Sequence, residues 1–532
     1  MPERHSRKLR RATTPSPSRD NPRMPSALSS RTGNELRWPG QLAAVDIGSN
    51  SFRLEVGQIQ GGRYRRVDYL KETVRLGAGL DAAGFLSEDA AARGLDCLAR
   101  FARRLDGFAP LQVRAVATQT LREAKNRNAF LLRAQTVLGH AIEIVSGREE
   151  ARLIFAGVAR LQPSTVARLV VDIGGRSTEM IVGRGTRPRT AESFQVGSVS
   201  LSMKYFPDGR FSERAFREAQ VAAGAELEEA LEPFAPRHWK EALGSSGTVG
   251  AVSSVLAANG VSDGRVTPPG LRWFMERCLE AGTTDKLALA GLKDERRAVI
   301  AGGLSILYTL ATHFGIDELK PARGALRQGV IFDLAARRAA EHRAGGEDLR
   351  ETSARELQRR FFVDVAQADR VARLAAALQA SAHPQASAEA QRELGWAAAL
   401  HEAGMMISHH DHHRHSAYLL AHVDAPGFSQ SQLRRIGELV LGQRGGLRKM
   451  EAALQSSSFA LDLLCLRVAV IVCHARDDVE PDALKLRLDA GQPIVVLAPA
   501  WSESHPRALH LLRAEIEAWA RTGVLAPKLL AV

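Results

Sequence analysis

Residues 169–183 combine residue types that can hold a phosphate group. They read LVVDIGGRSTEMIVG: an apolar run, an acid, two glycines, two hydroxyls and a second apolar run. Short apolar runs without a helical period predict buried strands, so this segment is a predicted strand–turn–strand hairpin. Glycines let a tight turn point successive backbone N–H groups into one concavity, which suits phosphate oxygens. Asp172, at the strand end, is placed to hold a hydrated divalent cation that bridges to the phosphate, and Glu179 is a second acid beside it.

The same pattern occurs at residues 43–57, AAVDIGSNSFRLEVG, where Asp46 takes the place of Asp172, 126 residues earlier. A repeat at this distance predicts two related α/β halves that present their hairpins to a shared cleft. The alternative is a pair of ordinary β-hairpins, whose turns need neither the preceding acid nor the following hydroxyls. Residues 243–250, LGSSGTVG, form a third glycine–hydroxyl loop, which is either a further set of donors or a plain surface turn.

Composition narrows the class of protein. A chain of 532 residues with 45% hydrophobic and 25% charged residues is typical of a globular protein with two or more domains. We find no apolar run long enough to span a bilayer and no secretory signal. The four cysteines are too scattered for a disulfide framework. These observations favour a cytoplasmic protein. The net charge of +13 favours polyanionic partners or peripheral contact with acidic lipid. No nucleic-acid-binding motif is present, so no specific nucleic-acid partner is expected.

Patterning divides the chain into five parts. Residues 1–38 are rich in Arg, Ser and Pro and are predicted to be a disordered basic tail. Alternating strands and helices follow, including a helix that begins after residue 147 and carries Glu149 and Glu150 in its first turn, where acids complement the helix dipole. We therefore expect α/β domains at 39–165 and 166–343, a helical domain at 344–478 and a small α/β segment at 479–532.

Several motifs in combination resemble those of the exopolyphosphatase / guanosine pentaphosphate phosphohydrolase (Ppx/GppA) family, in the actin-like ATPase superfamily. They are AAVDIGSNSFRL, RLGAGL, ATQTLREAKN, IEIVSGREEARLIFAGV, VVDIGGRSTE, GSSGT and GALRQGV, within residues 41–335. WAAALHEAG and HHRHSAYLL are similar to the helical domain of long bacterial exopolyphosphatases. The implied fold is α/β, with two actin-like (ribonuclease H-like) domains followed by a mostly α-helical domain that resembles HD phosphohydrolases.

The resemblance also implies roles for individual residues. Glu150 would be the catalytic residue that orients or deprotonates the attacking water, with Asp172 and the phosphate-facing Arg122 also catalytic. Mg²⁺ or Mn²⁺ would be held by Asp46, Asp172 and Glu179. The phosphate-binding loops would comprise Gly48, Ser49, Asn50, Ser51, Gly174, Gly175, Arg176, Ser177, Thr178, Ser245, Ser246, Gly247 and Thr248. Relatives are commonly dimers, so a homodimer is expected.

Three departures from the family pattern stand out. Arg176 replaces a third glycine, where it would clamp a phosphate, fill the site or strain the backbone. Gln328 stands where relatives often carry Glu. His401-Glu402 replaces the His-Asp pair that a binuclear metal site needs. We interpret the nearby histidines as solvated or anion-facing rather than as metal ligands. Arg414 and His415 are expected to line a channel for the polyphosphate chain. The histidines are His409, His410, His412, His413 and His415.

The leading hypothesis is an exopolyphosphatase acting on inorganic polyphosphate. The alternatives are a guanosine pentaphosphate 5′-phosphohydrolase, an actin-like ATPase or sugar kinase, and a non-catalytic sensor of polyphosphate or of guanosine penta- or tetraphosphate. Against a kinase, no convincing adenine-binding segment is present.

Overall fold

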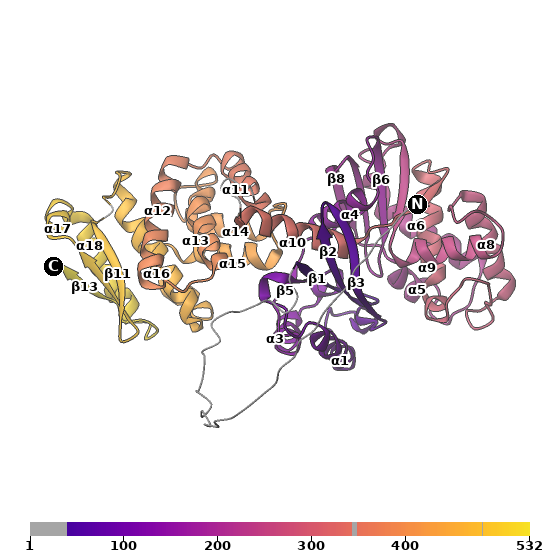
Figure 1. The fold of residues 1–532 in the computed structure, drawn as a ribbon, viewed down its shortest axis with the longest axis horizontal. Helices are drawn as coiled ribbons and strands as arrows, with labels where there is room; N and C mark the ends of the chain where they lie inside the picture. Colours follow the sequence, from indigo (N-terminus) through magenta and orange to yellow (C-terminus); the bar gives the residue numbers. More distant parts are fainter. Residues whose placement is uncertain (1–39, 343–347, 481, 532) are drawn as a thin grey trace, which may run out of the picture.

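The computed structural model describes residues 40–342, 348–480 and 482–531, so the predicted tail at 1–38 lies outside the described residues. An α/β body, a helical domain and a small C-terminal sheet follow one another along the long axis of the molecule (Figure 1). Helix α10 (Leu326–His342) ends the body and α11 (Leu349–Arg360) begins the helical domain, near the predicted change at residue 344.

The α/β body contains two sheets with the same topology. The first has the order β3-β2-β1-β4-β5 and the second β10-β9-β6-β7-β8. In each, a three-stranded antiparallel meander is extended by two parallel strands. The strands are β1 (Gln41–Ile47), β2 (Phe52–Gln60), β3 (Arg63–Glu72), β4 (Val113–Ala117), β5 (Ile142–Ile144), β6 (Ala167–Ile173), β7 (Thr178–Arg184), β8 (Arg187–Phe194), β9 (Glu241–Ser245) and β10 (Leu319–Pro321). This duplication confirms the two related halves predicted from the repeated hairpin.

Strand register places the repeated acids at equivalent positions. Asp46 pairs with Arg53 across the β1–β2 hairpin, and Asp172 pairs with Glu179 across the β6–β7 hairpin. Residues directly opposite in an antiparallel pair project from the same face. The first hairpin therefore presents an acid and a base together, whereas the second presents two acids.

Helices cover both sheets. In the first half they are α1 (Glu88–Arg104), α2 (Gln119–Glu123) and α3 (Arg127–Leu138), with the short turn η1 (Leu76–Gly79). In the second half they are α5 (Ser198–Tyr205), α6 (Glu213–Leu227), α7 (Ser246–Ala258), α8 (Pro268–Ala281) and α9 (Asp294–His313). The Ser87 hydroxyl caps α1 by accepting from the Ala90 N–H, and Cys97, Leu98 and Phe101 are buried on its inner face.

Two helices join the halves. α4 (Gly147–Leu161) and α10 share one apolar cluster with residues of both sheets, including Val116 from the first and Val170 from the second. They approach so closely that a Cβ at Gly329 would lie 1.7 Å from the Leu153 carbonyl oxygen. Only glycine allows this contact, so α4 and α10 form the shared spine of the body.

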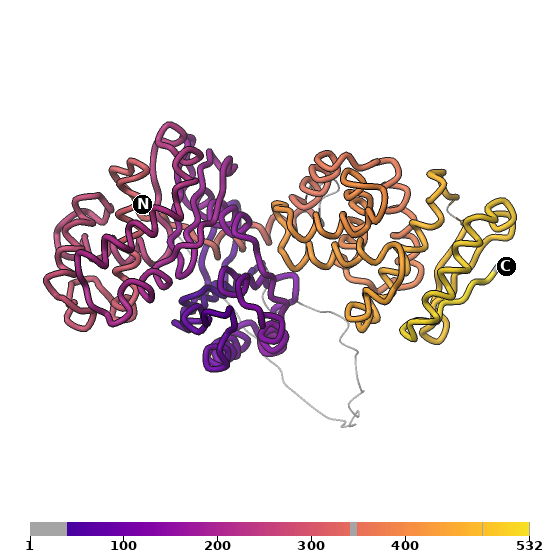
Figure 2. Tube along the Cα trace, turned by 180° about the vertical axis from the view of Figure 1, so that it is seen from behind, coloured from indigo at the N-terminus to yellow at the C-terminus, as the bar shows by residue number. Residues whose placement is uncertain are grey.

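The helical domain comprises α11, α12 (Val365–Ala382), α13 (Ala388–Leu400), α14 (His412–His422), α15 (Gln430–Gly442) and α16 (Ser457–Val472). The C-terminal sheet has β11 (Leu484–Asp489), β12 (Gln492–Leu497) and β13 (Lys528–Ala531), with α17 (Pro499–Ser504) and α18 (Pro506–Ala520). Leu486, Val495 and Trp519 belong to the same core as α13 and α16, so this sheet packs onto the helical domain (Figure 2).

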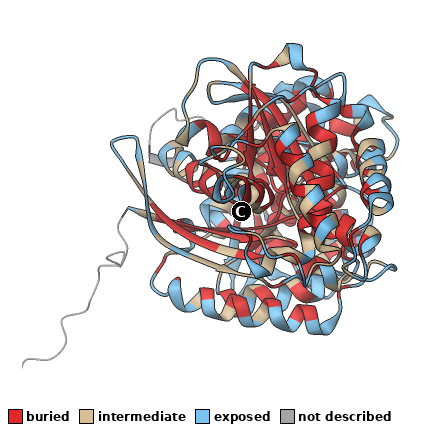
Figure 3. Ribbon diagram, turned by 90° about the vertical axis from the view of Figure 1, so that its right-hand side faces the viewer, coloured by how far each residue is buried: buried red, intermediate tan, exposed pale blue. Residues whose placement is uncertain are grey.

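One helical stretch is long and apolar enough to cross a membrane, which the sequence analysis missed. Residues Ser457–Ala475 have a mean hydropathy of 1.9 over their most apolar window, and 72% of that window is buried. Its charged residues are paired inside the domain, Arg467 with Glu515 and Asp462 with Gln379. The helix is thus a core helix, like the buried strands and inner helix faces seen in Figure 3.

Candidate active site

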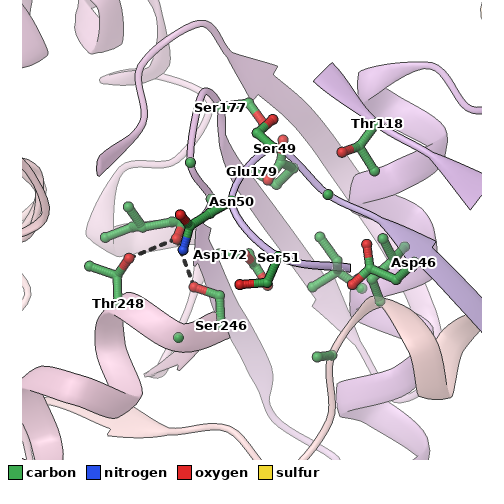
Figure 4. A pocket seen from close by; sticks show the side chains of 18 of the residues that line it. Asp46, Ser49, Asn50, Ser51, Thr118, Asp172, Ser177, Glu179, Ser246 and Thr248 are labelled. Carbon is green, nitrogen blue, oxygen red and sulfur yellow. Dashed lines mark hydrogen bonds between the residues drawn. The ribbon is translucent and has the colours of Figure 1, made fainter. Parts of the chain in front are cut away.

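A cleft of about 70 Å³ lies where the two hairpins meet the first turns of α4, α7 and α10. Figure 4 shows polar side chains from both halves lining it. The polar residues that line it are Asp46, Ser49, Asn50, Ser51, Arg53, Thr118, Glu150, Asp172, Ser177, Glu179, Ser198, Ser246, Thr248, Arg296 and Arg327, together with Gly48, Gly174, Gly175 and Gly247.

The first hairpin offers hydroxyl donors to the cleft. The Ser51 hydroxyl is buried and has no hydrogen-bond partner within the described residues. The Ser49 hydroxyl accepts a hydrogen bond from Thr120 at 2.8 Å, so its own proton stays available. A buried hydroxyl without a partner is costly unless a ligand satisfies it. This loop therefore fits an oxygen-rich anion.

The second hairpin contributes less than the sequence indicates. Gly174, Gly175 and Ser177 line the cleft, as predicted. The Thr178 hydroxyl instead donates to the Val196 carbonyl at 2.6 Å and lies outside the cleft lining. The prediction that Thr178 donates to phosphate is not supported by its placement, because its only proton is already used.

The third loop is a strand-to-helix junction rather than a turn, since β9 ends at Ser245 and α7 begins at Ser246. Ser245 donates to Gly324, and both Ser246 and Thr248 donate to the Ile173 carbonyl, at 2.7 and 3.0 Å. These hydroxyls hold the loop in place. Contrary to the prediction, their protons are not available to phosphate oxygens. The anion-binding groups here are the free backbone N–H groups of the α7 N-terminus. Ser246 has a left-handed φ of 73°, a strained conformation of the kind held at functional sites.

Three arginines that the sequence analysis did not assign line the cleft: Arg53, Arg296 and Arg327. Among the described residues, Arg296 makes no ion pair and no side-chain hydrogen bond. Burial and the nearby positive charge of Arg53 lower its pKa. A Cβ at Gly247 would lie 1.8 Å from the Arg296 guanidinium, so the glycine makes room for it. A half-buried cation that lines the cleft without a carboxylate partner is a ready phosphate ligand.

Strand register could have revealed Arg53, because it lies directly opposite Asp46 in the hairpin. Arg327 stands in the quoted GALRQGV motif, and its Nη1 lies 3.5 Å from Asp46. Arg296 carries no such signal, since in sequence it belongs to a charged helix start, DERR.

Four carboxylates, Asp46, Glu150, Asp172 and Glu179, lie together in the cleft. Burial, with Asp46 and Asp172 as neighbours, raises the pKa of Glu150 to about 7. Burial raises the pKa of Asp172, and burial with the charges of Glu150 and Asp172 raises that of Glu179. Such mutual repulsion marks a site built for a cation or for proton transfer.

The predicted cation ligands do not form a closed metal cage. Among the described residues, no three His, Cys, Asp or Glu side chains are grouped so as to hold a metal. Glu179 is engaged by the Ser193 hydroxyl at 2.8 Å. Mg²⁺ is commonly bound by one or two carboxylates, with water and phosphate oxygens completing its shell. Asp46 and Asp172 are buried and both line the cleft, which fits that arrangement.

Arg122 does not line the cleft, although it is close to it. Its Nη1 donates to Glu150 at 2.7 Å and to the Val145 carbonyl at 3.0 Å, while Nε and Nη2 donate to Gln119. The structure therefore places Arg122 behind Glu150, where it holds the carboxylate, and not facing the phosphate as the resemblance implies.

Arg176 also points away from the cleft. Its guanidinium pairs with Glu123 and donates to the Gly77 carbonyl, and its backbone has no positive φ. The expectations that Arg176 clamps a phosphate, fills the site or strains the loop are all wrong for this conformation. Gln328 contacts Glu55 through its amide nitrogen and the Ala325 N–H through its amide oxygen, a pair of contacts that a carboxylate could not make.

The residues singled out in the helical domain lie outside the cleft lining. His412 and His413 are buried in the first turn of α14, which corrects the interpretation of solvated histidines for these two. Arg414, His409 and His410 are exposed, and His415 is half-buried. His401 is buried against the Ala398 carbonyl. The polyphosphate-channel hypothesis for Arg414 and His415 stays a prediction.

Solved structures share the fold of the α/β body. An exopolyphosphatase from Cytophaga hutchinsonii is 23% identical over 55% of this chain and 97% of its own, with a TM-score of 0.50. A Ppx/GppA enzyme from Aquifex aeolicus is 25% identical over 55% of this chain and 98% of its own, with a TM-score of 0.46. The two halves are actin-like domains, as the resemblance implied, and a mostly helical domain follows them.

The family models extend the match over most of the described chain. The model of the Ppx/GppA phosphatase family matches residues 56–338, and that of its domain III matches residues 349–516. The first match contains the second hairpin, Glu150, Arg296 and Arg327, whereas the first hairpin up to Arg53 precedes it. The second match contains the helical domain and β11–β12. The chain therefore belongs to the Ppx/GppA phosphatase family.

Proposed function

We propose that this protein is an exopolyphosphatase, which removes terminal phosphate from inorganic polyphosphate by attack of a water that Glu150 activates. The observation that carries the proposal is the enclosed cleft, in which Arg296 and the Ser51 hydroxyl have no partner among the described residues and Glu150 faces them from α4.

Charge and donors in the cleft suit phosphoryl transfer. The oxygens of the terminal group would accept hydrogen bonds from Ser51, the α7 N-terminus and Arg296. Neutralising charge on these oxygens is the main task of a phosphoryl-transfer site. As the water oxygen bonds to phosphorus, the bridging P–O bond breaks, and Glu150 accepts the proton that the water loses. Arg122 keeps the Glu150 carboxylate in place for that transfer.

A divalent cation, Mg²⁺ or Mn²⁺, belongs to the proposal. Asp46 and Asp172 would hold it, and when bound it supplies charge neutralisation at the phosphate oxygens. Arg53 lies 3.3 Å from Asp46 and lines the same cleft, so its charge would add to that neutralisation.

The lining of the cleft favours polyphosphate over guanosine pentaphosphate. None of the described residues that line it is aromatic, and its apolar members are the aliphatic Ile154, Ile173, Ala325 and Leu326. A guanine base is commonly held by stacking or by a dedicated apolar pocket. Polyphosphate needs neither, because every unit of the chain offers the same oxygens.

The test is phosphate release from long-chain polyphosphate with and without Mg²⁺, with guanosine pentaphosphate as the parallel substrate. Release that requires the cation and favours polyphosphate supports the proposal. Preference for the nucleotide would assign the alternative phosphohydrolase activity. Binding of polyphosphate without release from either substrate would identify a sensor and refute an enzymatic role.

A further inference from the structure

Arg176 connects the two halves of the α/β body. It lies in the β6–β7 turn of the second half, and its Nη2 and Nε reach Glu123 of α2 in the first half, at 2.7 and 3.1 Å. Its Nη1 also donates to the Gly77 carbonyl of η1 at 3.2 Å. The two side chains are each about a quarter exposed, at 22% and 25%. Three bonds from one planar guanidinium fix the distance between the halves at this edge of the cleft.

The contact continues to Glu150 through two further side chains. Glu123 accepts from the Gln119 amide nitrogen at 2.6 Å, and the Gln119 oxygen accepts from Arg122 at 2.9 Å. Arg122 then donates to Glu150 at 2.7 Å. Because Gln119 must donate to Glu123 and accept from Arg122, the orientation of its amide is determined at both ends. A charge at position 176 is thus linked to the orientation of the carboxylate that faces the cleft.

A second contact between the halves lies at β3 and α9, where Lys71 and Thr73 bond to Glu295 at 2.5 and 3.3 Å. Glu295 directly precedes the cleft residue Arg296. Removing the Arg176 contact would leave the halves joined by their spine helices, by this contact and by the packing of Gly175 against Ser49, so they would be held less tightly at the Arg176 edge.

We propose that Arg176 and Glu123 form a latch between the two halves, which holds the cleft closed and, through Gln119 and Arg122, orients Glu150. Arg176 is in this view a positioning residue. The orienting role depends on the proposed exopolyphosphatase function, whereas the closing role does not.

Kinetics test the orienting role. Arg176→Met and Glu123→Gln should each lower kcat by about 10- to 100-fold with KM changed less than about threefold, since misplacing a catalytic group costs rate more than binding. The double variant should be no slower than the slower single variant, because the residues act as one unit. Arg176→Lys should recover part of the rate. Arg214→Met, which removes the exposed Arg214–Glu218 pair on α6 at 2.8 Å, is the matched control and should keep parental kinetics.

Distance measurements test the closing role without any activity. Leu132 in α3 and Val221 in α6 are 70% and 68% exposed, and all four native cysteines are buried, so Leu132→Cys and Val221→Cys accept spin labels selectively. Arg176→Met should lengthen or broaden the distance distribution between the labels, while Arg214→Met should not.

The outcomes separate the two proposals. If the parent protein hydrolyses neither substrate but Arg176→Met still changes the label distances, the latch stands and the proposed function fails. If the parent is active while Arg176→Met changes neither kcat nor the distances, the latch is refuted. Multiplicative losses in the double variant would also refute the link from Arg176 through Glu123.

Discussion

Glu150→Gln tests the proposed chemistry most directly. A positioned general base contributes about 10²- to 10⁴-fold to the rate, which corresponds to about 3–5 kcal/mol of transition-state stabilisation. The amide keeps the shape of the side chain but cannot take the proton. Arg122 retains Gln119 and the Val145 carbonyl as partners, so the change does not leave a buried cation alone. We therefore expect kcat to fall by this factor while polyphosphate affinity stays within about threefold.

The same variant should be no less stable than the parent. Burial and the neighbouring Asp46 and Asp172 raise the pKa of Glu150 from 4.5 to about 7, so its ionised form is disfavoured in the folded protein. A raised folded-state pKa means that this group's contribution to stability is present below about pH 4.5 and is lost as the pH rises through 7. Glu150→Gln removes that loss, so its unfolding free energy at pH 8 should equal or exceed that of the parent.

The pH dependence of kcat/KM gives a second test of Glu150 as the base. The base acts as a carboxylate, so kcat/KM of the parent should rise with pH along a limb at or below about 7, since a bound cation would favour the ionised form. That limb should vanish in Glu150→Gln.

Glu149→Gln is the matched control, because Glu149 lies in the same helical turn but bonds to Arg152 and to the Gly427 N–H, outside the cleft. It should lose stability more than rate. Polyphosphate hydrolysis by Glu150→Gln at the parental rate would refute the assignment of the base.

Three further changes probe other parts of the molecule. Arg296→Met should lower kcat/KM for polyphosphate by about 10- to 100-fold, as expected for a charge-assisted hydrogen bond, and a change below threefold would show that Arg296 does not contact the substrate. Gly329→Ala should lower the free energy of unfolding by about 1–3 kcal/mol or more in urea titrations, because its Cβ would overlap the Leu153 carbonyl, whereas Gly395→Ala in the open interior of α13 should be neutral or stabilising. Burial lowers the pKa of His412 to about 4, so the stability that its neutral form provides is present above pH 6.5 and is lost as the pH falls toward 4. His412→Gln should weaken this acid dependence of the unfolding free energy, and an unchanged dependence would contradict it.

The repeated hairpin and the apolar patterning were sufficient to predict the duplicated α/β halves and the helical domain. Both features depend on local sequence: strand, acid, glycine and strand in one case, and helical periodicity in the other. The hairpin pattern placed Asp46 and Asp172 at the cleft, because both stand near the end of a strand, whereas Ser51 and Glu150 were assigned through the family resemblance and also line the cleft.

Side-chain direction was beyond such reasoning. Arg122 and Arg176 stand in motifs that imply contact with phosphate, yet each turns to a carboxylate that comes from a different segment. The hydroxyls of Ser246 and Thr248 are used by the Ile173 carbonyl, a partner 73 and 75 residues away in sequence. Arg296 enters the cleft only because Gly247 leaves space for it. These choices are made by tertiary packing, which no local pattern encodes.

Gly427, between α14 and α15 of the helical domain, contacts both α4 and α10 of the α/β body. Its N–H donates to Glu149, beside Glu150, and its carbonyl accepts from Arg337 of α10 at 2.7 Å. Cutting the chain after α10 would remove this shared neighbour from the Glu149 carboxylate and the Arg337 guanidinium, next to the proposed base Glu150. The helical domain thus helps to hold α4 and α10 in place, and the two parts of the chain are not independent modules.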